Sequence, residues 1–160
     1  MKIKNVLIFI AAVAICFLPA ILAGIIGQPP GTWDWYKNLN KPPFNPPGWI
    51  FGPVWTLLYF LMGISLYLII RNGLKTPDSK KAVLYFAVQL MLNALWTPAF
   101  FYLHNPLLGL IDIIFLWISI VLTVTIFYKI NKTASILLWP YLIWTTFAGV
   151  LNFALYILNK

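Results

Sequence analysis

The sequence predicts an all-α membrane protein: a bundle of five transmembrane helices that forms one domain over residues 1–160. The first observation is composition, because 62% of the residues are hydrophobic and only 9% are charged. In a soluble domain about a quarter of the residues are charged. The second observation is that five apolar segments follow one another between charged or proline-rich breaks, and each is long enough to cross a bilayer.

The predicted spans cover residues 5–27, 48–70, 82–103, 107–129 and 134–157. Each has about 22 to 24 residues, close to the ~20 that a helix needs to cross hydrocarbon. The first follows Lys2 and Lys4 as a signal peptide would, but its apolar stretch is too long for one and four more spans follow. We therefore expect it to be a mature helix. Pro19, Pro98 and Pro140 are expected to bend the first, third and fifth helices.

The basic residues predict the orientation in the membrane. With five spans, the amino terminus and the second and fourth connections share one side, which carries Lys2, Lys4, Arg71, Lys75, Lys80, Lys81, Lys129 and Lys132. The other side carries Lys37, Lys41 and Lys160. The positive-inside rule therefore places the amino terminus on the cytoplasmic side if the host is a prokaryotic plasma membrane. Because the net charge of +8 is spread over helix ends and forms no stripe, we do not expect nucleic-acid binding.

The connection 28–47 and the helix entrance after it differ from a plain membrane anchor. The segment from Trp33 to Leu61 reads WDWYKNLNKPPFNPPGWIFGPVWTLLYFL. Its two Pro-Pro pairs and Pro53 weaken helix where an anchor would need it continuous. The segment is therefore expected to shape a binding site at the outer membrane surface, with residues 28–47 as its lid.

A depth estimate locates this site more closely. At ~1.5 Å per residue, Trp55 and Trp96 lie about 10 Å below the outer face, and Asp112 and Asn152 lie about 8 Å below it. Asn93 and Trp144 lie nearer the middle, whereas the inner half offers mostly Leu, Ile and Val. We expect a cavity with aromatic walls and a few polar anchors, which suits a large, flat, mostly apolar ligand.

Each of these residues also has a structural interpretation. Trp33, Trp35 and Trp49 are typical of an interfacial aromatic belt, and the deeper tryptophans can simply pack between helices. Asp112, the acid inside a span, is expected to bond another helix, through Asn93, Asn152 or a Trp N–H, or to contact the ligand. His104 is either an ordinary loop residue or an axial ligand for haem iron.

The sequence offers no residues for conventional catalysis. It contains no cluster of metal ligands, no nucleophile paired with a base and no pair of carboxylates. No metal site and no required cofactor are therefore expected, and the prediction leans away from an enzyme. The single cysteine, Cys16, lies in an apolar run and is interpreted as small helix filler.

Three long motifs carry a family resemblance: WYKNLNKPPFNPPGWIFGPVWTLLYFLMG, QLMLNALWTPAFF and PYLIWTTFAGVLN. With them, nearly the whole chain resembles a prokaryotic-type member of the translocator protein family, also called tryptophan-rich sensory proteins or peripheral-type benzodiazepine receptors. The resemblance implies a five-helix bundle, often a homodimer, with a cavity beneath the first loop. It implies porphyrins such as protoporphyrin IX or haem as ligands, and in some members sterols and isoquinoline carboxamides. The sterol pattern Leu151, Tyr156, Lys160 is looser here than in animal members.

The resemblance also implies the site residues. Positions that match the cavity lining of the family are Tyr36, Pro46, Phe51, Trp55, Asn93, Trp96, Trp144 and Ala148. Trp55 and Trp144 match the pair associated with light-dependent porphyrin breakdown in bacterial members. Pro43 is a departure, since some relatives carry an aromatic residue there.

Two functions follow as hypotheses. The first is a tetrapyrrole-binding receptor or translocator, and the second is an enzyme that degrades porphyrin with light and oxygen through Trp55 and Trp144. A proton- or ion-coupled transporter is disfavoured, because only one acid lies within a span and no inverted repeat is evident.

Overall fold

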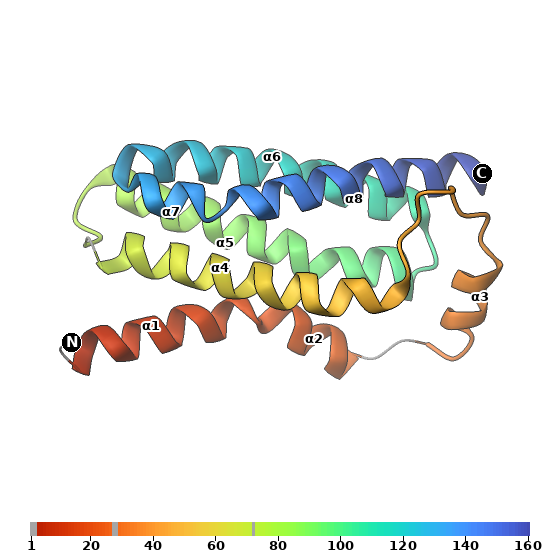
Figure 1. The fold of residues 1–160 in the computed structure, drawn as a ribbon, viewed down its shortest axis with the longest axis horizontal. Coiled ribbons are helices and arrows are strands. Elements are labelled where there is room, and N and C mark those ends of the chain that lie inside the picture. The colour runs from red at the N-terminus through yellow and green to blue at the C-terminus, as the bar shows by residue number, and fades with distance from the viewer. Residues whose placement is uncertain (1–2, 27–28, 72) are drawn as a thin grey trace.

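The computed structural model describes residues 3–26, 29–71 and 73–160, and within these ranges every regular element is helical. Figure 1 shows long helices side by side, with the two chain ends at opposite ends of the bundle. Helices long and apolar enough to cross a membrane cover Gly48–Arg71, Pro77–Tyr102, Pro106–Ile130 and Lys132–Leu158. The prediction of an all-α membrane protein is therefore confirmed, and four of the predicted spans correspond to these helices.

The first predicted span consists of two helices, α1 (Ile3–Cys16) and α2 (Leu18–Ile26). Their axes are bent by 44° at the break. The break precedes Pro19 by two residues, where a proline ring removes one backbone donor and crowds the preceding turn. The predicted bend is thus confirmed. Residues Gly27 and Gln28, where the predicted span ends and the predicted lid begins, lie outside the described residues.

The connection after α2 contains a short helix that the sequence did not reveal, α3 (Thr32–Asn38). It begins after Gly31, whose φ of 85° lies in the left-handed region that glycine adopts without strain. Asp34 in its first turn and Lys37 in its last turn oppose the partial charges of the helix ends. The lid therefore has a folded core.

Side-chain caps fix where the middle helices begin. A 3₁₀ turn, η1 (Gly48–Ile50), leads into α4 (Phe51–Arg71). The next helix, α5 (Pro77–Thr97), starts five residues before the predicted span because the Thr76 side chain accepts from the backbone N–H of Ser79. At Pro98 it changes into the π-helical turn η2 (Pro98–Tyr102), within a helical span that continues from Pro77 to Tyr102. The bend predicted at Pro98 stays a prediction.

The last two spans are formed by three helices. The Asn105 side chain accepts from the backbone N–H groups of Leu107 and Leu108 and caps α6 (Pro106–Ile130). The fifth predicted span is divided into α7 (Lys132–Ile136) and α8 (Trp139–Leu158). Pro140 lies in the first turn of α8, where a proline is well tolerated. The predicted bend within one helix is therefore replaced by a break just before Pro140.

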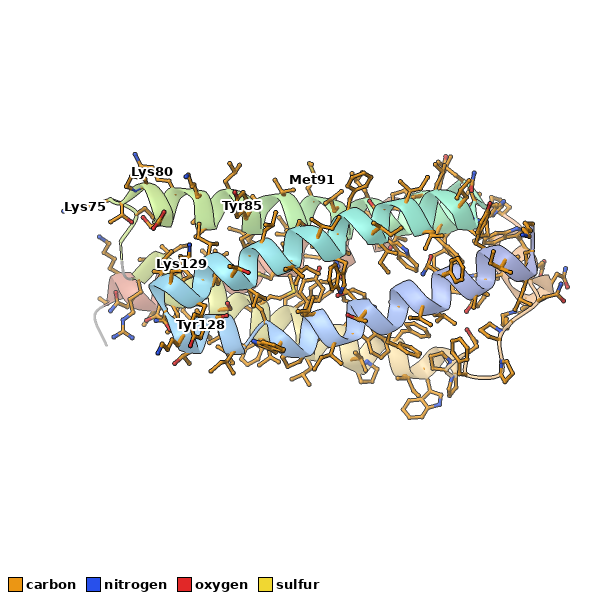
Figure 2. The ribbon with its side chains drawn as sticks, turned by 90° about the horizontal axis from the view of Figure 1, so that it is seen from above. Lys75, Lys80, Tyr85, Met91, Tyr128 and Lys129 are labelled. Carbon is orange, nitrogen blue, oxygen red and sulfur yellow. The ribbon has the colours of Figure 1, made fainter. Side chains whose placement is uncertain are left out.

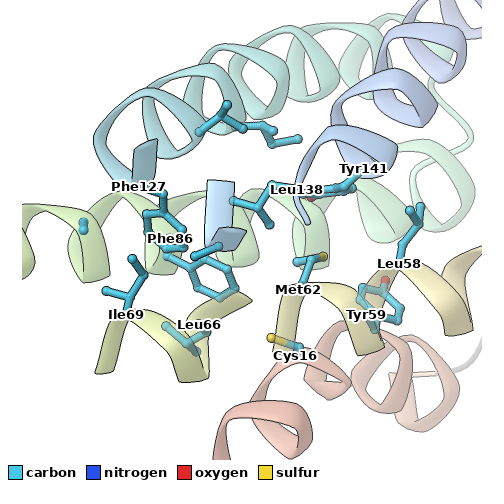
Figure 3. Close-up of a cluster of buried hydrophobic side chains, with 14 of the residues drawn as sticks. Cys16, Leu58, Tyr59, Met62, Leu66, Ile69, Phe86, Phe127, Leu138 and Tyr141 are labelled. Atoms are coloured by element: carbon cyan, nitrogen blue, oxygen red, sulfur yellow. The ribbon is translucent and has the colours of Figure 1, made fainter. Parts of the chain in front are cut away.

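Neighbouring helices pack around one apolar core. The most extensive contacts join α1 to α4, α5 to α6 and α6 to α8. The close-up in Figure 3 shows Cys16 of α1 and Met62 of α4 in one buried cluster, with Phe86 and Phe127 further along the core. Cys16 is fully buried, which agrees with its interpretation as helix filler.

The two ends of the bundle differ in charge. In Figure 1 the amino terminus lies at the same end as the α4–α5 and α6–α7 connections, whereas α3 and the carboxyl terminus lie at the other. Figure 2 shows Lys75, Lys80 and Lys129 toward the former end. We call these the basic end and the α3 end. Successive connections between the long helices therefore lie at alternate ends of the bundle, as the charge argument assumed.

A close approach of α1 to α4 yields a stability prediction. A Cβ added to Gly63 would lie 2.7 Å from the Cα of Val13, a backbone atom that cannot move aside. Gly63→Ala should therefore destabilise the bundle by about 1–3 kcal/mol and lower the melting temperature in detergent. Gly52→Ala is the matched control, since nothing lies within 4 Å of its added Cβ. It should leave the melting temperature unchanged or raise it. Equal melting of the two variants would contradict the proposed packing.

Candidate ligand site

The predicted site residues gather at the α3 end, where aromatic side chains of α4 and α8 meet. The rings of Phe51 and Trp144 have centroids 5.8 Å apart in an edge-on arrangement. One turn deeper, Trp55 stacks on Tyr59 at 5.3 Å and meets the edge of Tyr141 at 6.2 Å. These five residues form a wall that we call the α4–α8 wall.

A second aromatic group joins α5 and η2 to the lid. Trp96 stacks on Phe100 at 5.3 Å, and Phe100 in turn meets Tyr36 of α3 at 6.4 Å. Phe100 can lie this deep because Gly109 of α6 leaves room for it: a Cβ there would be 2.8 Å from the Phe100 ring. Burial raises the pKa of the Tyr36 phenol above its ordinary value, so this hydroxyl is neutral at physiological pH.

Asn93 connects three helices beneath these rings. Its Oδ1 accepts a hydrogen bond from the Tyr59 hydroxyl of α4 at 2.9 Å, and its Nδ2 donates to the Tyr141 hydroxyl of α8 at 3.1 Å. All three side chains are buried. Inside a membrane, where no water competes, such a bridge fixes the relative positions of α4, α5 and α8.

Asn152 makes a second, shallower polar contact. Its Oδ1 accepts from the indole N–H of Trp96 at 3.4 Å, and its Nδ2 donates to the carbonyl of Ala148 at 3.0 Å. Asn152 therefore holds the Trp96 ring against α8.

Four side chains have buried polar atoms without a hydrogen-bond partner in the described part of the protein. These atoms are the indole N–H of Trp144, Oδ2 of Asp112, Oδ1 of Asn45 in the lid and both amide atoms of Gln89. The expectation that Asp112 bonds Asn93, Asn152 or a Trp N–H is wrong, because the bonds above engage Asn93, Asn152 and Trp96 with other groups. The Trp144 ring contacts Phe51 and Phe147, so its unpaired N–H is a donor within the aromatic region.

The lid is fastened at two points. The Thr32 hydroxyl lies 2.8 Å from Nε2 of His104, and the His104 ring stacks on Trp35 at 4.7 Å. At the other point, the backbone N–H of Asn40 donates to Oδ1 of Asn159, and Nδ2 of Asn159 donates back to the Asn40 carbonyl. His104 therefore acts as a lid contact here, and its Nε2 is engaged.

The structure brings together most, but not all, of the predicted lining. Trp96 packs against both buried clusters, Tyr36 and Phe51 pack around Phe100, and Trp55, Trp144 and Ala148 border the main core. Pro46 is half-buried in the lid but joins neither cluster. Trp33 and Trp49 are 58% and 74% exposed, as expected for an interfacial belt.

Sequence reasoning missed three residues that build the site: Tyr59, Phe100 and Tyr141. One signal was available for Tyr59, because it lies four residues after Trp55 and therefore on the same helix face. Nothing in the sequence marks Phe100 or Tyr141 as distinct from other aromatic residues of their spans.

The structure also contains an open apolar groove of about 380 Å³ between α6 and α8. Its lining comprises Leu110, Ile113, Ile114, Trp117, Thr145, Thr146, Gly149, Val150 and Phe153. None of the predicted site residues borders it.

Fold and site together define a multi-pass integral membrane protein with an aromatic cluster at one end of a helical bundle. The family model described as TspO/MBR matches residues 12–158. The tryptophan-rich protein TspO of Archaeoglobus fulgidus is 47% identical, covering 97% of this chain and 99% of its own, and that of Chlorobaculum tepidum is 42% identical, covering 98% of both. The translocator protein of Bos taurus is 35% identical, covering 92% of this chain and 89% of its own.

The chain therefore belongs to the TspO/MBR family. The family resemblance predicted from the three motifs is confirmed.

The lid contact at Asn159 gives a prediction about local stability. Asn159→Ala removes the two hydrogen bonds to Asn40 and a third, from Nδ2 to the Leu155 carbonyl. Because each of the two bonds to Asn40 contributes about 1 kcal/mol, amide exchange over residues 32–41 should accelerate by roughly 10- to 30-fold, as measured by hydrogen–deuterium exchange. Asn38→Ala is the control: this exposed residue makes no side-chain hydrogen bond among the described contacts. If both variants exchange like the wild type, the hydrogen bonds between Asn40 and Asn159 do not hold the lid.

Proposed function

We propose that this protein binds tetrapyrroles, such as protoporphyrin IX or haem, among the aromatic side chains beneath α3, and acts as a receptor or translocator for them. The observation that carries the proposal is the buried, unpartnered indole N–H of Trp144 within the α4–α8 wall. An unpaired buried donor is unfavourable in a membrane bundle, and a ligand carboxylate or carbonyl would remove that cost.

The shape of the site supports a flat ligand. Phe51, Trp55 and Trp144 belong to the α4–α8 wall, and Trp96 stacks on Phe100 in the second aromatic group. Phe51 and Trp96 pack against the same small buried cluster, so a planar ring system bound here would meet aromatic surface from both groups. These rings now contact each other, and a ligand enters by replacing ring–ring contacts with its own. Opening the lid costs little free energy, because the hydrogen bonds between Asn40 and Asn159 are exposed.

The membrane arrangement is part of the proposal. We assign α1 and α2 together to one broken span, which gives five spans in all. The basic end then faces the cytoplasm and the α3 end faces outward, by the positive-inside rule. Two expectations from the resemblance stay predictions: a homodimer, and sterol-like or isoquinoline carboxamide ligands as competitors for the same site.

Light-dependent breakdown of porphyrin is the second candidate function. Trp55 contacts both Tyr59 and Tyr141, so oxidisable rings adjoin it within the α4–α8 wall. Light and oxygen would be the co-reactants, and Trp55 and Trp144 the residues beside the porphyrin. No required cofactor is proposed.

A dark titration tests binding. Protoporphyrin IX should give a saturable shift of its Soret band with the purified protein, and Trp144→Phe and Trp55→Phe should each weaken binding at least about threefold, the loss of one hydrogen bond or stacking contact. Trp139→Phe, which changes a tryptophan that is 51% exposed at the start of α8, should bind like the wild type. A shift that does not saturate, or three variants that all match the wild type, would refute the site.

Illumination separates the two candidate functions. If the protein is an enzyme, porphyrin absorbance should decline under light in air with the wild type and persist with Trp55→Phe and Trp144→Phe. If the protein is only a receptor or translocator, porphyrin should be lost at the same rate with all three proteins. Removing oxygen should then change the three rates alike.

Cysteine labelling tests the orientation. In a Cys16→Ala background, a membrane-impermeant maleimide added to intact cells should label Lys37→Cys, whose parent side chain is exposed on α3. It should label Lys75→Cys, at the basic end, only after permeabilisation. The reverse pattern would invert the proposed orientation.

A further inference from the structure

Gln89 occupies an unusual position in the core. It is 1% exposed, and neither its Nε2 nor its Oε1 has a hydrogen-bond partner in the described part of the protein. It lies on the interior face of α5, since Phe86, one turn before it, stacks on Phe127 of α6, and Asn93, one turn after it, bonds Tyr141 of α8.

An amide in this place is costly if it stays unpaired. Burying a primary amide without hydrogen bonds costs several kcal/mol, and the surrounding lipid cannot offer any. Leucine or methionine would fill the same volume without that cost. Asp112 differs in this respect, because its side chain is only half-buried. For Gln89 the partner must lie within the bundle.

The neighbouring hydrogen bonds leave one phenol proton free. In the hydrogen bonds described above, Tyr59 donates to Asn93 and Asn93 donates to Tyr141. The hydroxyl proton of Tyr141 therefore has no acceptor among the described contacts. If the Asn93 amide is turned over, Tyr141 becomes a donor and the proton of Tyr59 becomes the unused one. In either arrangement the cluster offers a donor to the same region of the core.

One molecule of water would satisfy the buried amide. Residues four apart lie on the same face of a helix, and side chains tilt toward the helix amino terminus, so the Asn93 amide overhangs the turn that carries Gln89. A buried water needs two to four polar partners, and Gln89 alone supplies two.

We propose that Gln89, Asn93 and Tyr141 form an internal water site at the inner edge of the α4–α8 wall. The bound water donates to Oε1 of Gln89 and accepts from the free phenol or from Nε2 of Gln89. This site is independent of the proposed tetrapyrrole binding. The water hydrates the part of the core one turn below Asn93. Through this water, Gln89 acts as a positioning residue for the Asn93 bridge.

Water-edited solid-state NMR on the full chain in bilayers tests the site directly. Magnetisation from water should reach the side-chain amide of Gln89 several-fold faster than that of Asn152. Asn152 is the matched control, because it is equally buried but its Nδ2 already donates to the Ala148 carbonyl. The Gln89 signal is identified by its loss in Gln89→Met. Equally slow transfer to both amides would overturn the proposal.

Thermal unfolding gives a second, independent test. Gln89→Met keeps the volume of the side chain but removes the two amide atoms that Gln89 offers to the water. It should therefore lower the melting temperature by roughly 3–6 °C. Leu92→Met, at a half-buried position on the same helix, controls for the introduction of methionine. If the amide were dry, Gln89→Met would instead relieve a desolvation cost and raise the melting temperature, which would overturn the proposal.

Discussion

The hydrogen bonds of Asn93 with Tyr59 and Tyr141 hold together the helices that build the site. In a bilayer the hydrophobic effect does not drive one apolar helix against another, so specific positions depend on packing and on bonds between polar side chains. One amide here joins α4, α5 and α8. The aromatic walls rest on this bridge, because Trp55 lies against both of the tyrosines that Asn93 bonds.

The same constraint explains why the unpartnered atoms are informative. Lipid satisfies no polar group, so a buried donor or acceptor without a partner indicates something that the protein chain does not supply. The N–H of Trp144 lies in the α4–α8 wall and favours a ligand, whereas the amide of Gln89 lies in the core on α5 and favours water. The proposed site therefore combines an aromatic part with a polar base.

Segment length, hydropathy and charge were enough to predict a helical membrane protein whose connections lie at alternate ends of the bundle. Both properties follow directly from the need to cross a bilayer. Helix α3 escaped prediction, since its seven residues are mostly polar or aromatic and it begins at a left-handed glycine. The partners of Asp112 were also mispredicted. Depth along a helix is set by its rise, but which side chains meet depends on rotation and tilt, and these are determined by packing at positions such as Gly63 and Gly109.

The most direct test of the ligand site is the indole ¹H–¹⁵N resonance of Trp144 during a dark titration with protoporphyrin IX. The account predicts a saturable downfield shift of this N–H as it acquires an acceptor, while the exposed Trp49 and Trp139 stay nearly unchanged. A resonance of Trp144 that does not move while those of Trp49 and Trp139 shift would place the porphyrin on the outer surface of the bundle and contradict the account.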